Sequence, residues 1–238
     1  MQRNVLKKLL PINLLTLAVV LVVALTVSET AIYVNQTTPV QTGMTVIIDP
    51  GHGLPDGGTT SCTGVLESEL NLEISQRLKD MFCFFGVHTV MTRTSSDSVY
   101  TEGNTIARKK ISDTRNRVSM VNSIDNAVLL SIHQNHFYDS RYSGAQVFYA
   151  GNEESKSLAI KLQADLVTTL NPDSNRKAKK STGVYLMEHI DCTGVLIECG
   201  FLSNQQEENL LRSSAYQKKL CAVIATSFLS YMNQNGVS

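Results

Sequence analysis

Short apolar runs alternate with longer amphipathic stretches along most of this chain. Five runs have the length and composition of buried strands, at 44–49, 87–93, 127–133, 144–150 and 193–200. Between them apolar residues recur at three- and four-residue spacing, which predicts helices over 67–85, toward the end of 104–124, over 152–170 and over about 214–233. Strands separated by helices of this length imply crossover connections. The pattern therefore predicts an α/β fold, with a mostly parallel sheet flanked by helices on both faces.

The N-terminal region departs from this pattern. Three basic residues precede an uncharged apolar run over 9–27, which is about long enough to cross a bilayer core of roughly 20 residues. The run lacks a clear small-x-small cleavage site, which favours a membrane anchor over a removed signal peptide, and a buried core helix is the third alternative. We expect an anchor or signal segment over 1–27, a linker over 28–43 and a catalytic domain over 44–238, exported from the cytoplasm.

Charge and cysteine content narrow the class of protein. Lys and Arg number 21, as do Asp and Glu, so the formal net charge is zero and nucleic acid is not an expected partner. The five cysteines are an odd set with no CxxC pair, which does not indicate a disulfide framework. Cys83 and Cys221 lie in helical apolar patterns and are expected to be packing residues. Cys62 is a weak candidate for an additional metal ligand.

Four side chains on separate segments suggest a metal-dependent hydrolase. His52 follows the first predicted strand, Glu67 begins the first predicted helix, and His133 ends the third strand. Two imidazoles and one carboxylate form a three-ligand zinc set that leaves a position open for water. Glu198, near the end of the last strand, is a second carboxylate that can move the proton. Since ligands in such sheets bind at the carboxyl ends of strands, these residues are expected to converge.

Each of these residues also has an ordinary structural interpretation. His52 could be an exposed turn histidine, Glu67 could complement a helix dipole, and His133 could be a hydrogen-bonded core histidine. His136 competes with His133, although the strand period puts the two on opposite faces. Glu198 is the hardest to dismiss, because a buried carboxylate in an apolar strand is unfavourable unless it is paired or near a metal.

Asp49 lies three residues before His52 and has two interpretations. It could accept the second N–H of the His52 ring, as metal-bound histidines usually require. It could instead be a turn or cap residue. The sequence does not favour either.

Four ordered blocks of the sequence resemble a known family. They are VIIDPGHG, GVLESELNLE, SIHQN and IECGFLSN, and they resemble the zinc-dependent N-acetylmuramoyl-L-alanine amidases of the amidase-3 type over roughly 44–233. The resemblance implies a single globular α/β domain with a six-stranded, mostly parallel sheet. It implies one zinc ion per chain held by His52, Glu67 and His133, with Glu198 as the general base.

Two further residues are expected to bind substrate. Asn135 follows His133 in SIHQN, and Arg93 ends the second predicted strand. Either could bind the substrate or the oxyanion that forms during amide hydrolysis. His136 departs from the family pattern, which usually has a small residue at this place.

A narrower resemblance concerns the biological setting. The stretches TIARKKISDTRNRV and SGAQVFY, together with the apolar N-terminal segment, resemble germination-specific amidases of endospore formers. That resemblance implies action on spore cortex peptidoglycan, as the first step towards muramic-δ-lactam, in the intermembrane space of the developing spore. An accessory sporulation protein that supports activity stays open as a partner, and the membrane is expected to hold the N-terminal segment.

Two other functions stay open from the sequence. The chain could be a zinc peptidase that cuts within the stem peptide, since its ligand set would be similar. It could also be an anchored wall-binding protein without activity. Glu198 argues against the second alternative, because a pure binder needs no buried, unpaired acid.

Overall fold

The structure, a computed structural model, describes residues 43–235 of the chain. The expected anchor or signal segment over 1–27 lies outside these residues, as does the expected linker apart from Gly43. Within the described range, no helix combines the length and apolar character needed to cross a bilayer. The expected catalytic domain over 44–238 lies within the described residues, apart from its last three.

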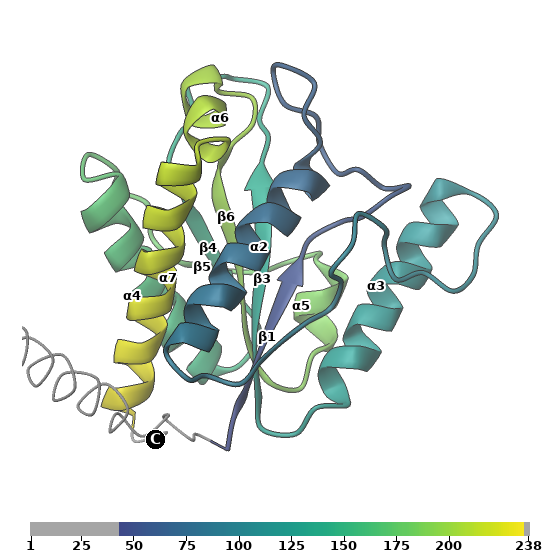
Figure 1. Cartoon of the computed structure of the whole chain (residues 1–238), viewed down its shortest axis with the longest axis horizontal. Helices are drawn as coiled ribbons and strands as arrows, with labels where there is room; N and C mark the ends of the chain where they lie inside the picture. The colour runs from purple at the N-terminus through teal and green to yellow at the C-terminus, as the bar shows by residue number, and fades with distance from the viewer. Residues whose placement is uncertain (1–42, 236–238) are drawn as a thin grey trace, which may run out of the picture. The chain divides into compact units, whose positions relative to one another are not determined.

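Six strands form one sheet, in the spatial order β2-β1-β3-β6-β4-β5 (Figure 1). The strands are β1 (Thr45–Pro50), β2 (Thr89–Met91), β3 (Ala127–Asn135), β4 (Gln146–Tyr149), β5 (Lys179–Lys180) and β6 (Thr193–Phe201). All neighbouring pairs are parallel except β4 and β6, which run antiparallel. The predicted α/β fold with a mostly parallel sheet of about six strands is confirmed.

Helices cover both faces of the sheet, as the apolar pattern predicted. They are α2 (Glu67–Phe84), α3 (Ile106–Asn122), α4 (Glu153–Leu170), α5 (Tyr185–His189), α6 (Gln205–Leu211) and α7 (Ser214–Gln234). One buried cluster joins α2, α4 and α7 to alternate residues of the central strands, and α7 lies between α2 and α4 (Figure 1). A second, smaller cluster joins α3 and α5 to the opposite face. The strands β1, β3 and β6 are apolar on both faces because each face packs against helices.

Three short elements were not predicted from the sequence. The strand β5 has two residues and the helices α5 and α6 have five and seven, too few for a periodic pattern to emerge. The expectation that Cys83 is a packing residue is wrong, because it is exposed in the last turn of α2, whereas Cys221 is buried as predicted. All five cysteines are free.

The sheet brings the candidate residues to one edge. The central strands β1, β3 and β6 are adjacent and parallel, so their carboxyl ends lie side by side. In the register of β3 and β6, His133 lies directly beside Glu198. His52 follows the end of β1, and the first residue of α2 is Glu67.

Candidate active site

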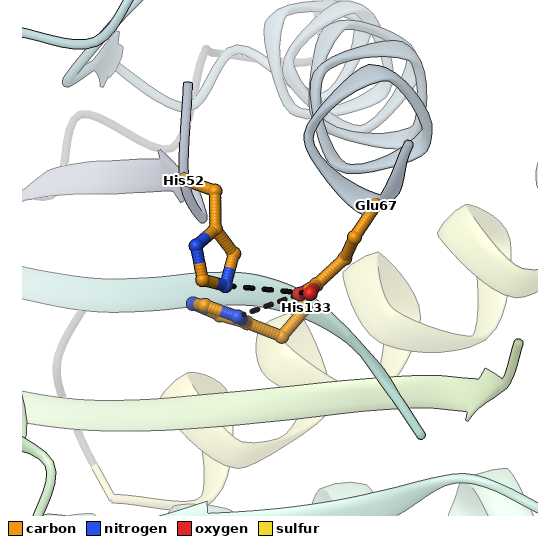
Figure 2. Close-up of side chains that lie close together, drawn as sticks. All are labelled: His52, Glu67 and His133. Carbon is orange, nitrogen blue, oxygen red and sulfur yellow. Dashed lines mark hydrogen bonds and ion pairs between the residues drawn. The ribbon is translucent and has the colours of Figure 1, made fainter. Parts of the chain in front are cut away.

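Three side chains meet where a metal ion could bind. His52, Glu67 and His133 each offer one ligand atom, and these atoms all lie within 4.8 Å of one another. The Nε2 atom of His52 is 3.3 Å from one Glu67 carboxylate oxygen, and the Nδ1 atom of His133 is 3.0 Å from the other. Figure 2 shows the two rings and the carboxylate pointing toward one another from three separate elements. The structure therefore brings together the three residues that the sequence singled out as ligands.

His52 lies in a turn whose backbone is unusual for a residue with a side chain. Its φ is 60°, in the left-handed region that disfavours residues other than glycine and that often occurs at functional sites. The Nδ1 atom lies 2.9 Å from a carboxylate oxygen of Asp56, and Lys110 Nζ is 3.0 Å from the same oxygen. Asp56 thus orients the ring so that Nε2 faces Glu67. Asp56 was not among the residues predicted from the sequence, although it is the second aspartate of DPGHGLPDGG.

Asp49 has neither of the two roles considered for it. Its buried carboxylate accepts hydrogen bonds from Thr92 Oγ1 at 2.6 Å and Ser131 Oγ at 2.7 Å, and it forms an ion pair with Arg117. Burial alone would raise the pKa of Asp49, but Arg117 and the two hydroxyls lower it to about 2. Asp49 is therefore an anion at the centre of a buried polar network.

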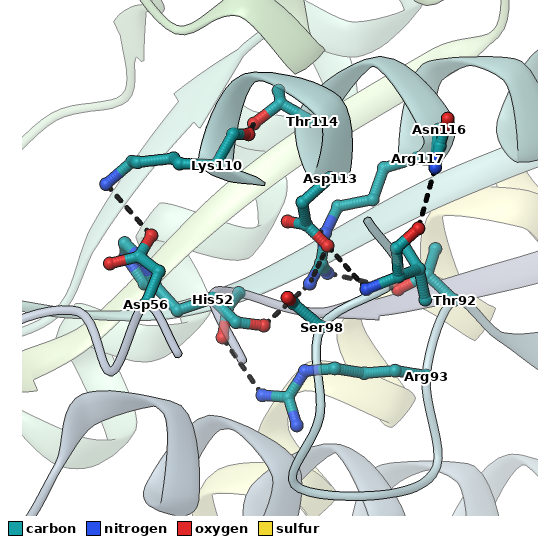
Figure 3. Close-up of polar contacts among 12 residues, drawn as sticks. His52, Asp56, Thr92, Arg93, Ser98, Lys110, Asp113, Thr114, Asn116 and Arg117 are labelled. Atoms are coloured by element: carbon teal, nitrogen blue, oxygen red, sulfur yellow. Dashed lines mark hydrogen bonds and ion pairs between the residues drawn. The ribbon is translucent and has the colours of Figure 1, made fainter. Parts of the chain in front are cut away.

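Two buried arginines hold the backbone of the turn that carries His52. Arg117, on α3, donates to the carbonyl of Pro50 at 2.8 Å and to that of His52 at 2.6 Å, and its Nε donates to Asp113 at 2.8 Å (Figure 3). Burial would lower the pKa of Arg117, but Asp49 and Asp113 raise it, so the guanidinium stays charged. The helix α3 thereby fixes a turn about 65 residues away in sequence.

Arg93, expected to bind substrate, has other contacts in the structure. Its buried guanidinium donates to the carbonyls of Pro50, Gly51, Ser68 and Ser95, at 2.8–3.0 Å. Figure 3 shows it beside the turn, on the side away from α3. Through these contacts Arg93 holds the backbone of the turn in place. The expectation that it contacts substrate stays a prediction.

Glu67 has more partners than a helix N-terminus requires. One carboxylate oxygen accepts from Asn71 Nδ2 and from the backbone N–H of Gln134, both at 3.2 Å, and the other from the N–H of Thr59 at 3.0 Å. Burial would raise the pKa of Glu67, but His133 and His52 lower it to about 2. The carboxylate is thus anionic and held in one orientation, as a metal ligand should be.

Two glycines leave room for the cluster. A Cβ on Gly51 would lie 2.2 Å from Cε1 of His133, so the ring packs directly against the backbone of the turn. Gly58 has a φ of +70°, and a Cβ there would lie 2.5 Å from a Glu67 carboxylate oxygen. The glycines of DPGHGLPDGG therefore do more than form a turn, since they allow the ligands to approach one another.

Glu198 lies beside the cluster but outside it. The residue is half-buried, and its Oε2 atom is buried with no hydrogen-bond partner among the described residues. Burial raises the pKa of Glu198 to about 8, with the nearby Glu67 carboxylate acting in the same direction and His52 opposing both. An unsatisfied buried carboxyl with a pKa near neutrality is suited to accepting and returning a proton.

A cleft of about 720 Å³ opens onto these residues. His52, His133 and Glu198 line its floor, α3 forms one wall and the segment leading into α5 forms the other. The walls carry Lys110 and Ile111 on α3 and Tyr185 at the start of α5. A larger hollow of about 820 Å³, next to β4 and the segment before β5, contains none of the candidate residues. The chemistry therefore favours the smaller cleft.

Other candidates lie outside the cluster. Asn135 ends β3 and is half-buried, and its backbone carbonyl accepts a hydrogen bond from the N–H of Leu202 at 2.8 Å. The expectation that its side chain binds substrate stays a prediction. His136 is exposed and is not one of the clustered ligand groups. The Sγ of Cys62 donates to the carbonyl of Leu202 at 3.3 Å, so this thiol is not a fourth ligand in the structure.

The residues present fit a zinc ion. Two imidazole nitrogens and a carboxylate are a common donor set of catalytic zinc sites, which keep one further position open. The donors are already oriented by Asp56, Asn71 and the backbone of Gln134. Glu198, whose Oε2 has no partner among the described residues, is the neighbour of His133 in the register of β3 and β6, so a proton acceptor lies beside the donor set.

Comparison with known proteins identifies the family. The sequence model for Amidase_3, described as N-acetylmuramoyl-L-alanine amidase, matches residues 46–229. The chain belongs to this family. The resemblance found in the four sequence blocks is confirmed, and with it the assignment of the chain as an amidase of the cell-wall polymer peptidoglycan, which acts outside the cytoplasm.

The individual relatives agree with this assignment. The chain is 37% identical over 196 residues to a germination-specific N-acetylmuramoyl-L-alanine amidase of Bacillus subtilis, covering 82% of each protein. The amidase CwlD of Clostridioides difficile, solved in complex with the lipoprotein GerS, is similar with a TM-score of 0.77 and 33% identity, over 80% of this chain and 98% of that one. A second amidase, from Clostridium difficile 630, has a TM-score of 0.69 and 28% identity, over 80% of this chain and 97% of that one.

Proposed function

We propose that this amidase hydrolyses the bond between N-acetylmuramic acid and L-alanine in spore cortex peptidoglycan, with one zinc ion per chain. His52, Glu67 and His133 are the proposed ligands, and Glu198 is the proposed general base. The observation that carries the proposal is the meeting of three ligand atoms within 4.8 Å beside one unpartnered acid, on the floor of a cleft.

The residues of the chain have distinct roles in this reaction. A bound zinc ion supplies Lewis acidity, which makes water a better nucleophile near neutral pH and polarises the scissile carbonyl. Glu198 takes a proton from the attacking water and returns it to the departing alanine nitrogen, so the proton is recycled within one turnover. Asp56 keeps Nε2 of His52 aimed at the ligand cluster throughout. The two walls of the cleft position the stem peptide beside the scissile bond.

The cortex is proposed as the location because of two relatives. The Bacillus subtilis relative is germination-specific, and the Clostridioides difficile relative was solved with a lipoprotein partner. By analogy, this enzyme acts in the intermembrane space of the developing spore, where its N-terminal segment anchors it or directs its export. Removal of the stem peptide there is the first step towards muramic-δ-lactam, and an accessory sporulation protein supports the activity.

Product analysis tests the proposed reaction. The purified full-length protein is incubated with cortex peptidoglycan, with zinc, with a chelator, and with zinc restored after chelation. We expect mass spectrometry to find a free lactyl carboxyl on muramic acid and a new amine on L-alanine, only when zinc is present. New amines within the stem peptide would instead identify a peptidase, and the absence of any cleavage with zinc and the accessory protein would identify a wall-binding protein.

A further inference from the structure

Four aromatic side chains form a continuous row at the carboxyl end of the central strands. The ring centroids of Phe201 and Tyr142 are 6.1 Å apart, those of Tyr142 and Phe137 4.7 Å, and those of Phe137 and Tyr138 4.4 Å. Phe201 is buried, whereas Phe137 is 37%, Tyr142 45% and Tyr138 90% exposed. We call these four residues the aromatic row. Three of its rings face solvent and are only partly covered by the described residues.

The aromatic row lies at the same end of the sheet as the candidate catalytic residues. His133 and Glu198 are neighbours in the register of β3 and β6, and Asn135 and Phe201 are the next neighbours recorded on the same strands. The register shifts between these two pairs, because two residues of β3 lie opposite three of β6, so the strands carry a bulge here. Phe201, the neighbour of Asn135 on β6, packs near the Tyr142 ring and is the first residue of the row. The row therefore begins beyond this bulge, at the same end of β3 and β6 as His133 and Glu198.

The segment that carries the exposed rings is anchored to the end of β6. The backbone N–H of Phe137 donates to Ser203 Oγ at 3.1 Å, and Asn204 Nδ2 donates to the carbonyl of Tyr142 at 3.3 Å. The guanidinium of Arg176 lies over the Phe201 ring, 4.9 Å from its centroid. Ser203 and Asn204 belong to the block IECGFLSN, and through these hydrogen bonds they hold Phe137 and Tyr142, the two middle members of the aromatic row.

We infer that the aromatic row binds the glycan strand of the substrate, on the sugars next to the muramic acid whose peptide is removed. The inference rests on the proposed function, because the polymer that carries the scissile bond is a glycan. The C–H faces of pyranose rings pack against flat aromatic faces, and the hydroxyl of tyrosine can bind the sugar edge in addition. Exposed aromatic patches of this kind mark interaction sites. The chain has no tryptophan, so tyrosine and phenylalanine must supply the stacking surfaces.

Polar groups around the row agree with a sugar ligand. The exposed Arg141 forms an ion pair with Asp139 at 2.7 Å, and His136 is exposed next to Phe137. Charged and planar polar side chains at the margin of aromatic rings are what a hydroxyl-rich ligand requires, whereas the centre of a protein interface is depleted of charge. The aromatic row lies at the same end of the sheet as the candidate catalytic residues, where the glycan of the substrate is expected to bind.

Binding of peptide-free glycan strands to the full-length protein tests the inference. These strands carry no scissile bond, so the result judges the aromatic row even if the proposed hydrolysis fails. We expect Tyr138→Ala to raise the apparent Kd about tenfold, which corresponds to the loss of about 1.4 kcal/mol. Phe137→Ala should weaken binding as well, and Tyr138→Trp should preserve it. Phe84→Ala is the matched control, because Phe84 is 84% exposed and stacks on Phe85 away from the row.

The outcomes separate cleanly. Weaker glycan binding by Tyr138→Ala but not by Phe84→Ala supports the inference. In hydrolysis of long strands that still carry the stem peptide, a raised KM for Tyr138→Ala with little change in kcat would support it further. Equal binding by wild type and Tyr138→Ala overturns it, and is also what a row that docks a protein would give. A wild-type protein that does not bind glycan strands overturns it too. Failure of the wild type to release peptide, with glycan binding intact, would count against the proposed hydrolysis alone.

Discussion

Glu198 shows how a strand can place one polar group where it is chemically useful. Its neighbours Ile197 and Cys199 are buried in the core that faces α2, α4 and α7, so the strand period turns Glu198 toward the cleft. There it lies beside His133 with an oxygen that no donor satisfies among the described residues. A group left unsatisfied in this way is unfavourable for stability, and its position beside the ligand cluster is consistent with a role in proton transfer.

Replacing Glu198 should separate metal binding from catalysis. We expect Glu198→Gln to bind zinc with wild-type stoichiometry but to lose about 10²- to 10⁴-fold in turnover, because the amide cannot accept the proton. Metal analysis and kcat on purified peptidoglycan measure the two effects. His133→Ala is the contrasting variant, since it should lose both. Wild-type turnover by Glu198→Gln would remove this residue from the mechanism.

Gly51 offers a test of how closely the ligands are packed. A methyl group there would overlap the His133 ring, so we expect Gly51→Ala to push the ring out of place and lower zinc affinity about 10- to 100-fold. A zinc competition titration measures the change. Gly151→Ala is the control, because a Cβ at Gly151 would meet nothing within 4 Å. Unchanged zinc affinity in Gly51→Ala would mean that the ring can shift without loss.

The helix α3 and the turn after β1 act as one unit. Arg117 reaches from the helix to Asp49 on the strand and to two carbonyls of the turn, and Arg93 holds the same turn from the other side. The left-handed conformation of His52 is therefore maintained by partners on other elements, as strained residues usually are.

Removing the Arg117 guanidinium should disturb both stability and the site. We expect Arg117→Gln to lower the free energy of unfolding by about 3–5 kcal/mol, because two buried carboxylates lose their partner. Urea unfolding measures this loss, and zinc affinity should fall in the same variant. Arg115→Gln changes an exposed arginine of the same helix and should stay within about 0.5 kcal/mol of wild type. A stable Arg117→Gln protein would contradict the assigned network.

At the scale of the whole domain, two hydrophobic clusters on opposite faces of the sheet hold the fold together. The polar network around Asp49 links neighbouring strands of the sheet. Residues of β1 and β3, and Thr92 directly after β2, meet in this network through the carboxylate of Asp49 and the hydroxyl of Ser131. Because this network contains a buried anion, the stability of the entire domain depends on pH.

The pH dependence has a definite sign. The pKa of Asp49 is about 2 in the folded protein against an ordinary value of 3.8, so its contribution to stability is fully present above about pH 4 and is lost as pH falls toward 2. The contribution is about 2 kcal/mol. We expect the difference in free energy of unfolding between wild type and Asp49→Asn, measured in urea at several pH values, to shrink over this range. A difference that stays constant from about pH 5 to pH 2 would contradict the ionised state of Asp49.

Local periodicity was enough to predict most of this molecule. Apolar spacing and alternation are set by the geometry of the helix and the strand, so the long elements and the helices on both faces could be read directly from residues such as Leu70, Ile74 and Leu78. The candidate ligands could be found because their blocks are local too: His52 in a glycine-rich turn, His133 and Glu198 at the ends of apolar runs.

Partners distant in sequence were decided only by the tertiary structure. Asp49 pairs with Arg117, 68 positions away, and the aromatic row joins Tyr142 to Phe201. The antiparallel direction of β4, the two-residue strand β5 and the short helix α5 likewise depend on packing against elements already in place. The spacing of apolar residues in the sequence predicts which face of a helix or strand is buried, but not which other element packs against that face. Strand order and register determine which side chains meet, and they exist only once the sheet has formed.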